Sequence, residues 1–257
     1  MIFKTSNLSG FFSNLRDGTA FQIRFRDRVG AGIALATALK FSIKNNKKNE
    51  EKILVLGIPR GGVIVADVVA QKMDAELGII MAKKLSAPDN KENAIGAVME
   101  DSSLYLDDFL VKSLKISKEY IENEKQEQMQ EIKRRKALYC SSLPSLSDNN
   151  DGSNNNRQYH IKDRIVVLVD DGIATGATVI AAARWIRKQE PERLIIAAPV
   201  AQPQAADLLK KEKEVVDAIE IISTPSNFGS VNQFYQNFDQ ATDEKVIEIL
   251  RGRNQPL

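Results

Sequence analysis

The feature that most constrains the fold of this chain is a run of apolar residues that ends in two adjacent acids. Residues 165–179 read IVVLVDDGIATGATV, and the first five are all apolar and mostly β-branched. Such a run is typical of a strand that is buried on both faces of a parallel sheet. An Ala-rich segment that predicts a helix over 179–189 follows. The stretch therefore predicts the strand–loop–helix unit of an α/β fold.

The loop between that strand and that helix has the chemistry of a phosphate site. Residues 172–178 would bring backbone N–H groups, two Thr hydroxyls and the positive end of a helix dipole to one place. Asp170 and Asp171 stand at the carboxyl end of the strand, where open α/β sheets bind their ligands. A sugar phosphate, with a phosphate on one side and hydroxyls on the other, is the simplest ligand that fits. The alternative is an ordinary Asp-Gly turn with solvated acids.

The rest of the sequence alternates between short apolar runs and amphipathic segments, which predicts a central parallel sheet flanked by helices. Further strands are expected at 53–56, 77–82, 194–198 and 218–222, and further helices at 22–43, 63–73 and 202–211. The buried face of the first helix is expected to carry Val29, Ile33, Ala36, Leu39 and Ile43.

Four other segments have distinct expected forms. Residues 94–99 and 104–106 predict a hairpin, and residues 109–138 predict a long and largely exposed helix. Residues 44–52 are expected to form a charged loop, and the Ser/Asn-rich residues 141–160 a mobile polar loop. We expect residues 1–257 to be a single domain that contains this loop.

Composition narrows the function classes. A net charge of +2 gives no reason to expect bulk affinity for nucleic acid, although a local basic patch stays open. Cys140 is the only cysteine, so no intramolecular disulfide can form, and a cytoplasmic protein is expected. No apolar run reaches the roughly 18 residues of a membrane span, and no secretory signal is expected at the N-terminus. His160, the only histidine, ends the polar loop and is not expected to be catalytic.

The residues from Val166 to Thr178 resemble the signature of type I phosphoribosyltransferases, which bind the activated ribose donor phosphoribosyl pyrophosphate (PRPP). The resemblance covers most of residues 22–250. It implies a central parallel sheet flanked by helices, with a small cap built from the terminal regions. It also implies that Asp170 and Asp171 bind the ribose 2′- and 3′-hydroxyls. The 5′-phosphate would be held by Ala174, Thr175, Gly176, Ala177 and Thr178.

Two further segments resemble the parts of that family that bind the pyrophosphate leaving group. After the strand at 53–56 comes a glycine-rich loop in which Arg60 offers a planar fork of donors. Lys83 and Lys84 resemble the family's basic pair, and residues 86–98 resemble its flexible flap. The alternatives are a Pro-Gly turn and ordinary surface lysines. The resemblance assigns the leaving group to Ile58, Pro59, Arg60, Gly61 and Gly62 together with the two lysines.

The acceptor stays open. Phe228 lies in an aromatic C-terminal stretch that corresponds to part of the family's cap, where it could stack on a flat heterocycle or simply belong to the core. Residues 25–28 (FRDR) resemble those of a poorly defined subgroup of the family. Family members that use 6-oxopurines carry a carboxylate where this chain has Ala174, so hypoxanthine and guanine are weaker candidates.

The leading hypothesis is a transferase that moves ribose 5-phosphate from PRPP to a nitrogen acceptor and depends on Mg²⁺ bound to the diphosphate. One alternative is a PRPP-sensing regulator without turnover, which could bind nucleic acid through the basic run at 133–136. Another is a hydrolase that uses water as the acceptor. A homodimer is the family's habit. The retained lysines and the flap favour catalysis.

Overall fold

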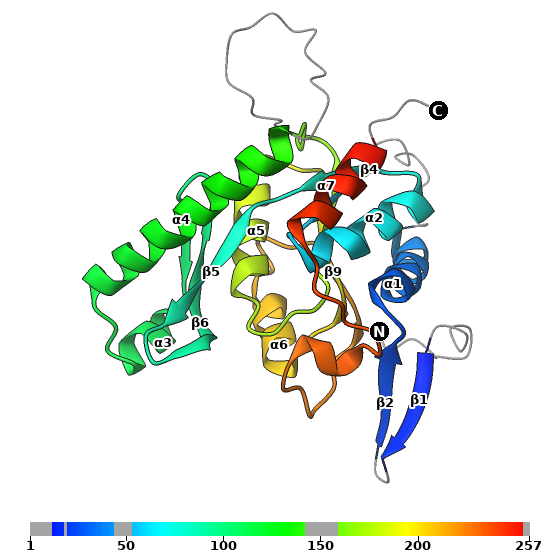
Figure 1. The fold of residues 1–257 in the computed structure, drawn as a ribbon, viewed down its shortest axis with the longest axis horizontal. Helices are drawn as coiled ribbons and strands as arrows, with labels where there is room; N and C mark the ends of the chain where they lie inside the picture. Colours follow the sequence, from blue (N-terminus) through cyan, green and yellow to red (C-terminus); the bar gives the residue numbers. More distant parts are fainter. Residues whose placement is uncertain (1–11, 18–19, 44–52, 142–158, 254–257) are drawn as a thin grey trace, which may run out of the picture.

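The computed structural model describes residues 12–17, 20–43, 53–141 and 159–253 (Figure 1). Its centre is a five-stranded parallel sheet in the order β10-β9-β8-β3-β4. Every residue of β3 and of β8 is buried, as the two apolar runs predict. The strands are β3 (Ile53–Gly57), β4 (Glu76–Ile79), β8 (Ile165–Val169), β9 (Arg193–Val200) and β10 (Ala218–Ser223).

Helices cover both faces of this sheet. Side chains of β3, β8 and β9 alternate between two apolar clusters, because successive residues of a strand point to opposite faces. One cluster joins the sheet to α1 and α2, and the other joins it to α5 and α6. The predicted fold class, a central parallel sheet flanked by helices, is confirmed. The helices are α1 (Arg28–Ile43), α2 (Gly61–Met73), α5 (Ala177–Arg187) and α6 (Pro203–Lys211).

The first predicted helix, 22–43, is too long at its N-terminal end. Residues 21–25 (FQIRF) alternate apolar and polar side chains, which is the period of a strand, and they lie in β2 (Ala20–Phe25). This strand pairs with β1 (Phe12–Asp17) in a separate antiparallel ribbon. The predicted helix face is also wrong at Val29, which is 44% exposed. Small residues instead let α1 pack closely on α2, since a Cβ on Gly32 would lie 2.7 Å from the Val68 Cβ.

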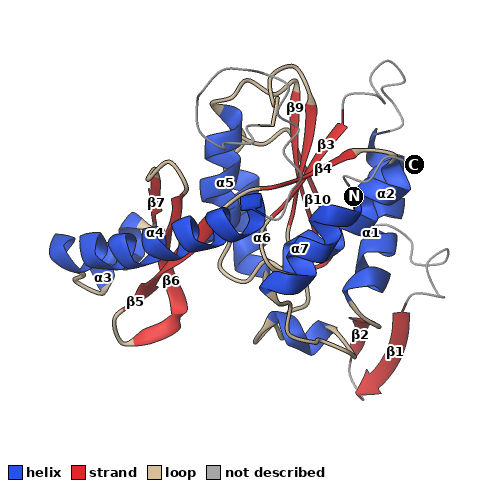
Figure 2. Ribbon diagram, turned by 45° about the horizontal axis from the view of Figure 1, so that its top comes forward, coloured by secondary structure: helices blue, strands red, loops and turns tan. Residues whose placement is uncertain are grey.

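A second, three-stranded antiparallel sheet projects from one side of the core (Figure 2). It contains the predicted hairpin as β6 (Asn90–Met99) and β7 (Leu104–Leu106), with β5 (Ala82–Ala87) added at its other edge. The predicted strand 77–82 is therefore divided between β4 and β5. We call β5, β6 and β7 the flap sheet.

The predicted single helix over 109–138 is wrong, because the chain forms two helices there. The α3 helix (Asp108–Ser113) is capped by Asp107, and Lys115 then has φ of 51°, which a continuing helix does not allow. The α4 helix (Lys118–Ser141) starts where Ser117 Oγ accepts a hydrogen bond from the Tyr120 N–H. This helix crosses the flap sheet and buries Ile132 and Tyr139, so it is not only a solvated face.

The C-terminal part contains a short 3₁₀ turn, η3 (Val231–Phe234), and the helix α7 (Asp243–Gly252). Most of the predicted loops at 44–52 and 141–160, and the side chain of Cys140, lie outside the described part of the chain. None of the described helices has the length and the apolar character needed to cross a bilayer.

Candidate active site

The acid pair and the glycine-rich loop come together because β3 and β8 are neighbours in the sheet. The Ile58 N–H donates to Val169 O over 3.0 Å, so the loop after β3 starts beside the end of β8. A Cβ on Gly62 would lie 2.9 Å from Val169 O and 3.0 Å from Asp170 Cα. The backbone of this loop therefore approaches the acids as closely as glycine permits. The Pro59–Arg60 peptide bond of the loop is cis.

The two acids have different surroundings. The Asp171 N–H donates to Asp170 Oδ1 over 2.9 Å. Burial raises the pKa of the Asp170 carboxyl well above its usual value, and the neighbouring Asp171 carboxylate raises it further. Asp171 instead accepts a hydrogen bond from Arg28 Nε over 2.7 Å, and this ion pair is largely buried. Two carboxylates thus stand side by side with one guanidinium on the second.

Arg28 is a site residue that sequence reasoning missed. It opens α1, and besides Asp171 it donates to Asp239 O over 2.7 Å and lies 3.8 Å from the centre of the Phe238 ring. Tyr235 Oη also donates to the backbone oxygen of Asp171 over 2.6 Å. Arg28 and Asp171 are 143 residues apart, so no spacing pattern connects them. The only signal was the FRDR segment itself.

The loop from Ala174 to Thr178, which we call the phosphate loop after its predicted ligand, is anchored at its start by Ile173 and leads into α5. The Ile173 N–H donates to Val200 O over 2.9 Å, and the Gln202 N–H donates to Ile173 O over 2.8 Å. Gly176 has φ of +83°, which favours glycine. Within the described residues, no side chain from the N-cap position bonds to the first turn of α5. The first N–H groups of a helix have no partner inside it, so those that follow Ala177 in α5 can bind an anion, while the Ala177 N–H bonds weakly to Thr175 Oγ1.

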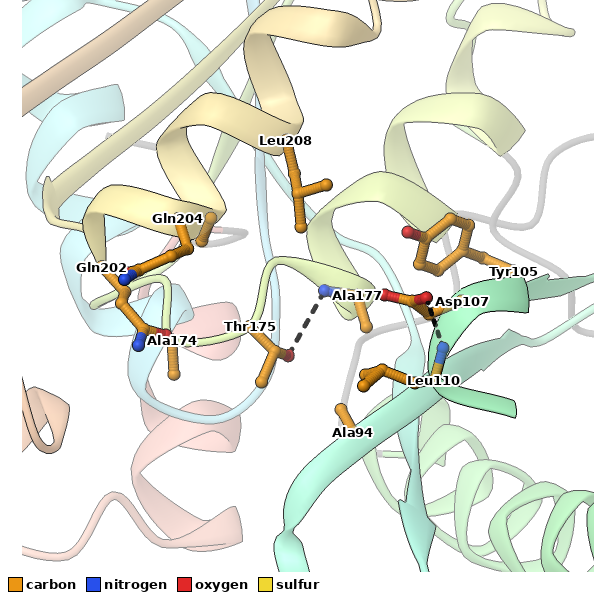
Figure 3. A pocket seen from close by; sticks show the side chains of 11 residues that line it. Ala94, Tyr105, Asp107, Leu110, Ala174, Thr175, Ala177, Gln202, Gln204 and Leu208 are labelled. Atoms are coloured by element: carbon orange, nitrogen blue, oxygen red, sulfur yellow. Dashed lines mark hydrogen bonds between the residues drawn. The ribbon is translucent and has the colours of Figure 1, made fainter. Parts of the chain in front are cut away.

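A cavity of about 170 Å³ lies beside this loop, between α6, the flap sheet and α3 (Figure 3). Thr175 is on the loop side of it, and its Oγ1 accepts a hydrogen bond from the Ala177 N–H over 3.5 Å. The cavity is lined by Ala94, Tyr105, Asp107, Leu110, Ala174, Thr175, Ala177, Gln202, Gln204, Ala205 and Leu208.

The two lysines of the predicted basic pair point to opposite faces of β5. Lys83 is on the face of Leu85, which packs against α4, and Lys84 is on the face of Ala82, which packs toward α5. Burial lowers the pKa of the Lys83 amine, and the positive charges of Arg135 and Arg60 lower it further, while Glu131 opposes them. The structure therefore brings Lys83 into the electrostatic surroundings of Arg60 and places Lys84 on the other face.

The remaining predicted residues occupy ordinary positions. Phe228 is half-buried and packs on Phe234, with 5.1 Å between ring centroids, in an apolar cluster that also contains Phe25 and Tyr235. His160 is exposed. Among the described residues, no three His, Cys, Asp or Glu side chains are grouped so that they could hold a metal ion.

Comparison with known proteins gives the family. A family model described as "Phosphoribosyl transferase domain" matches residues 28–239. Two Mycobacterium tuberculosis proteins, named "Putative phosphoribosyl transferase" MT0597 and Rv0571c, are each 31% identical over 226 residues. That alignment covers 88% of this chain and 46% of theirs, so the chain spans less than half the length of these curated relatives.

A solved structure agrees with this result. The crystal structure of TT1426 from Thermus thermophilus is 36% identical, with a TM-score of 0.67. The match covers 88% of this chain and 97% of that one. The matched family segment starts at Arg28 and ends at Asp239, the two residues that a hydrogen bond joins across the site. This chain belongs to the phosphoribosyl transferase domain family, in its type I branch.

Proposed function

We propose that this protein transfers ribose 5-phosphate from PRPP to a nitrogen acceptor and releases pyrophosphate. The observation that carries the proposal is the position of the acid pair, Asp170 and Asp171, between two backbone loops suited to anions. One loop, Ala174 to Thr178, opens α5 and would hold the 5′-phosphate. The other, Ile58 to Gly62, opens α2 and would hold the diphosphate, so we call it the diphosphate loop. This order of groups matches PRPP, with its phosphate, hydroxyls and diphosphate.

The reaction breaks the bond between ribose C1 and a diphosphate oxygen and forms a bond between C1 and the acceptor nitrogen. Positive charge develops on the ribose, and negative charge develops on the leaving group. Asp170 and Asp171 would orient the hydroxyls and favour the ribosyl cation, while Arg60 and Lys83 would stabilise the departing diphosphate. Lys84 would act on the substrate from the opposite face of β5.

Mg²⁺ fits this scheme as an ion that arrives with the substrate. The described residues offer no cluster of metal ligands, and Mg²⁺ commonly binds through substrate phosphates with several waters kept. Bound there, it would neutralise charge on the leaving group.

The flap sheet, which α4 supports, would exclude water from the reacting ribose. Tyr120 Oη donates to Ser86 O over 3.0 Å, and the Ser86 N–H donates to Glu124 Oε1 over 3.1 Å, so α4 supports the end of β5. Exclusion of water would protect the ribosyl cation from hydrolysis.

The acceptor is proposed only as a class, a nucleobase or related nitrogen compound. Ala174 leaves no carboxylate within the phosphate loop, which argues against 6-oxopurines. Phe228 would contribute to acceptor binding at the edge of its aromatic cluster. The proposal extends to one domain over residues 1–257, to a homodimer and, from the cysteine usage, to a cytoplasmic location.

The ion pairs of the basic run 133–136 argue against a regulator that binds nucleic acid through this run. Three side chains of the basic run 133–136 are already in ion pairs. Arg134 pairs with Glu131 and Asp243, Arg135 with Glu131, and Lys136 with Glu100. Charges neutralised in this way contribute little to binding of nucleic acid phosphates.

The test is pyrophosphate release from Mg²⁺-PRPP, with and without a panel of purines, pyrimidines and small amines. Acceptor-dependent release supports the transferase, and release without any acceptor supports the hydrolase. The double variant Asp170→Asn with Asp171→Asn should abolish turnover. Asp207→Asn, an exposed change on α6, is the matched control. Wild-type rates in the double variant would contradict the assignment of the acids, and PRPP binding without release would support the sensor.

A further inference from the structure

We propose that Arg28 is a positioning residue for the site. It holds Asp171 in the orientation that accepts a ribose hydroxyl, and it ties that orientation to the C-terminal segment 235–239. This inference rests on the proposed function, because it gives Asp171 a ribose to bind. It adds Arg28 of α1 to the site, and it couples the acid pair to the C-terminal segment 235–239.

The contact between Arg28 and Asp171 fixes one carboxylate oxygen and leaves the other to the substrate. Arg28 Nε donates to Oδ2 over 2.7 Å, and the side chains are only 9% and 16% exposed. An ionised carboxylate has about four acceptor positions on its two oxygens. The Arg28 bond therefore sets the rotation of the carboxylate, and Oδ1 keeps the capacity to accept from a hydroxyl.

Arg28 is itself held from the C-terminal side. Its terminal nitrogen donates to Asp239 O over 2.7 Å, and its guanidinium lies 3.8 Å from the Phe238 ring centre. Cations at this distance from an aromatic face are attracted by the ring quadrupole. The guanidinium is thus clamped between the acid pair and the segment that follows η3.

The C-terminal segment is attached to the same end of α1. The Gln236 N–H donates to Phe25 O over 2.8 Å, and the Asn237 N–H donates to Arg26 O over 2.9 Å. Tyr235 Oη reaches back to the Asp171 backbone oxygen over 2.6 Å. A shift of this segment would therefore move Arg28 and Asp171 together.

Charge supports the same role. Two adjacent carboxylates repel one another, and the neighbouring guanidinium lowers the pKa of Asp170 against the effects of burial and of Asp171. Tyr235 also faces this pair, and burial raises the pKa of its hydroxyl well above the usual value, so it stays neutral. Arg28 is therefore the cation that favours ionised acids when a ribosyl cation develops.

The test compares Arg28→Met and Arg28→Lys with Arg26→Met. Arg26 is two residues away, pairs with the adjacent Asp27 and has its side chain 68% exposed, so it is a matched control. Ribose 5-phosphate and Mg²⁺-pyrophosphate serve as separate probes in calorimetric titrations. They separate the ribose-binding end of the site from the diphosphate-binding end.

Arg28→Met should weaken ribose 5-phosphate binding by about tenfold or more, because a charge-assisted bond to Asp171 is lost. Pyrophosphate binding should stay within about twofold, because the diphosphate loop keeps its own donors. Arg28→Lys should recover part of the ribose affinity, and Arg26→Met should match the wild type. Equal weakening of both probes in a folded Arg28→Met variant would overturn the inference.

Two further variants keep the inference testable if Arg28→Met does not fold. Phe238→Leu removes the ring that clamps Arg28 and should also weaken ribose 5-phosphate selectively. In a cycle with Asp171→Asn, Arg28→Lys should add almost no further loss, because both changes act on one contact. Additive losses would overturn the inference. If the wild type binds neither PRPP nor ribose 5-phosphate, the proposed function fails first; if the wild type binds and every Arg28 variant matches it, only the inference fails.

Discussion

Among single residues, Gly61 marks the closest approach between the diphosphate loop and the acid pair. A Cβ at this position would overlap the Asp171 carboxylate and lie 2.9 Å from Arg28 Nε. Gly61→Ala should therefore separate the ion pair and weaken PRPP binding by about tenfold or more, the loss expected for one charge-assisted hydrogen bond. Calorimetric titration with PRPP measures the effect.

The control for that change is Gly252→Ala. Gly252 is at the end of α7, and a Cβ there would have no neighbour within 4 Å. This variant should bind PRPP as the wild type does. If Gly61→Ala binds PRPP as tightly as the wild type, the diphosphate loop can move away from the acid pair without loss of affinity. The close approach would then have no role in PRPP binding.

Asp170 should make the folded protein less stable as the pH rises. Burial and the neighbouring Asp171 raise its folded pKa above the ordinary value of 3.8. A raised acid pKa contributes stability that is complete below the unfolded pKa and is lost as the pH rises through the folded one. Asp170→Asn removes that loss and keeps an oxygen for the Asp171 N–H.

Asp170→Asn should therefore gain stability relative to the wild type as the pH rises above about 4, by roughly 1.4 kcal/mol for each unit of raised pKa. Denaturant unfolding at pH 5 and pH 8 measures the difference. If the stability difference between Asp170→Asn and the wild type is constant or narrows toward pH 8, ionisation of Asp170 does not destabilise the folded protein. The variant should be more stable and inactive, as expected where a site holds a charge at a cost in stability.

Single residues also show where sequence reasoning ends. Asp170, Asp171 and the phosphate loop could be located because all their chemistry is contiguous in sequence. Arg28 could not, because its bonds to Asp171 and Asp239 join three distant segments. A buried arginine at the start of a helix looks in sequence like any exposed one, and only the fold supplies its partners.

At the level of elements, the alternation of β5 separates two lysines that are adjacent in sequence. Lys83→Met should weaken pyrophosphate binding by about tenfold or more, because Lys83 faces the side of Arg60. Lys84→Met should change it by about threefold or less, because a more distant exposed charge is screened by salt. Titration of both variants with Mg²⁺-pyrophosphate compares them directly.

Each lysine variant is the control for the other, since the side chains and the change are the same. Equal losses would mean that both lysines reach the diphosphate, as the family resemblance alone implies. A larger loss in Lys84→Met would place the leaving group on the α5 side of the flap sheet.

The predicted boundaries of elements are wrong where a strand pattern and a helix pattern meet. Residues 22–25 carry a strand pattern directly before a helix, and an apolar count over the whole window joins the two. The break between α3 and α4 depends on two caps, from Asp107 and Ser117, inside a uniformly charged stretch. Caps are short signals, and high helix propensity on both sides of them conceals them.

At the scale of the whole molecule, the sheet order creates the site. The sequence predicts each core strand, but it does not reveal the order β10-β9-β8-β3-β4. In that order β3 pairs with β8, so the loop after residue 57 meets the acids after residue 169. The two halves of the site therefore lie far apart in sequence and meet only in the folded sheet.

The whole molecule should respond to Mg²⁺ only together with the substrate. The described residues have no cluster of ligands for the free ion, while the diphosphate of PRPP would supply its oxygens. Mg²⁺ alone should leave the unfolding temperature unchanged. Mg²⁺ with PRPP at about a hundred times its Kd should raise that temperature by roughly 5–10 °C, because a ligand that binds only the folded state stabilises it. Thermal unfolding with EDTA as the control measures this, and a comparable rise with Mg²⁺ alone would mean that the protein itself holds the metal.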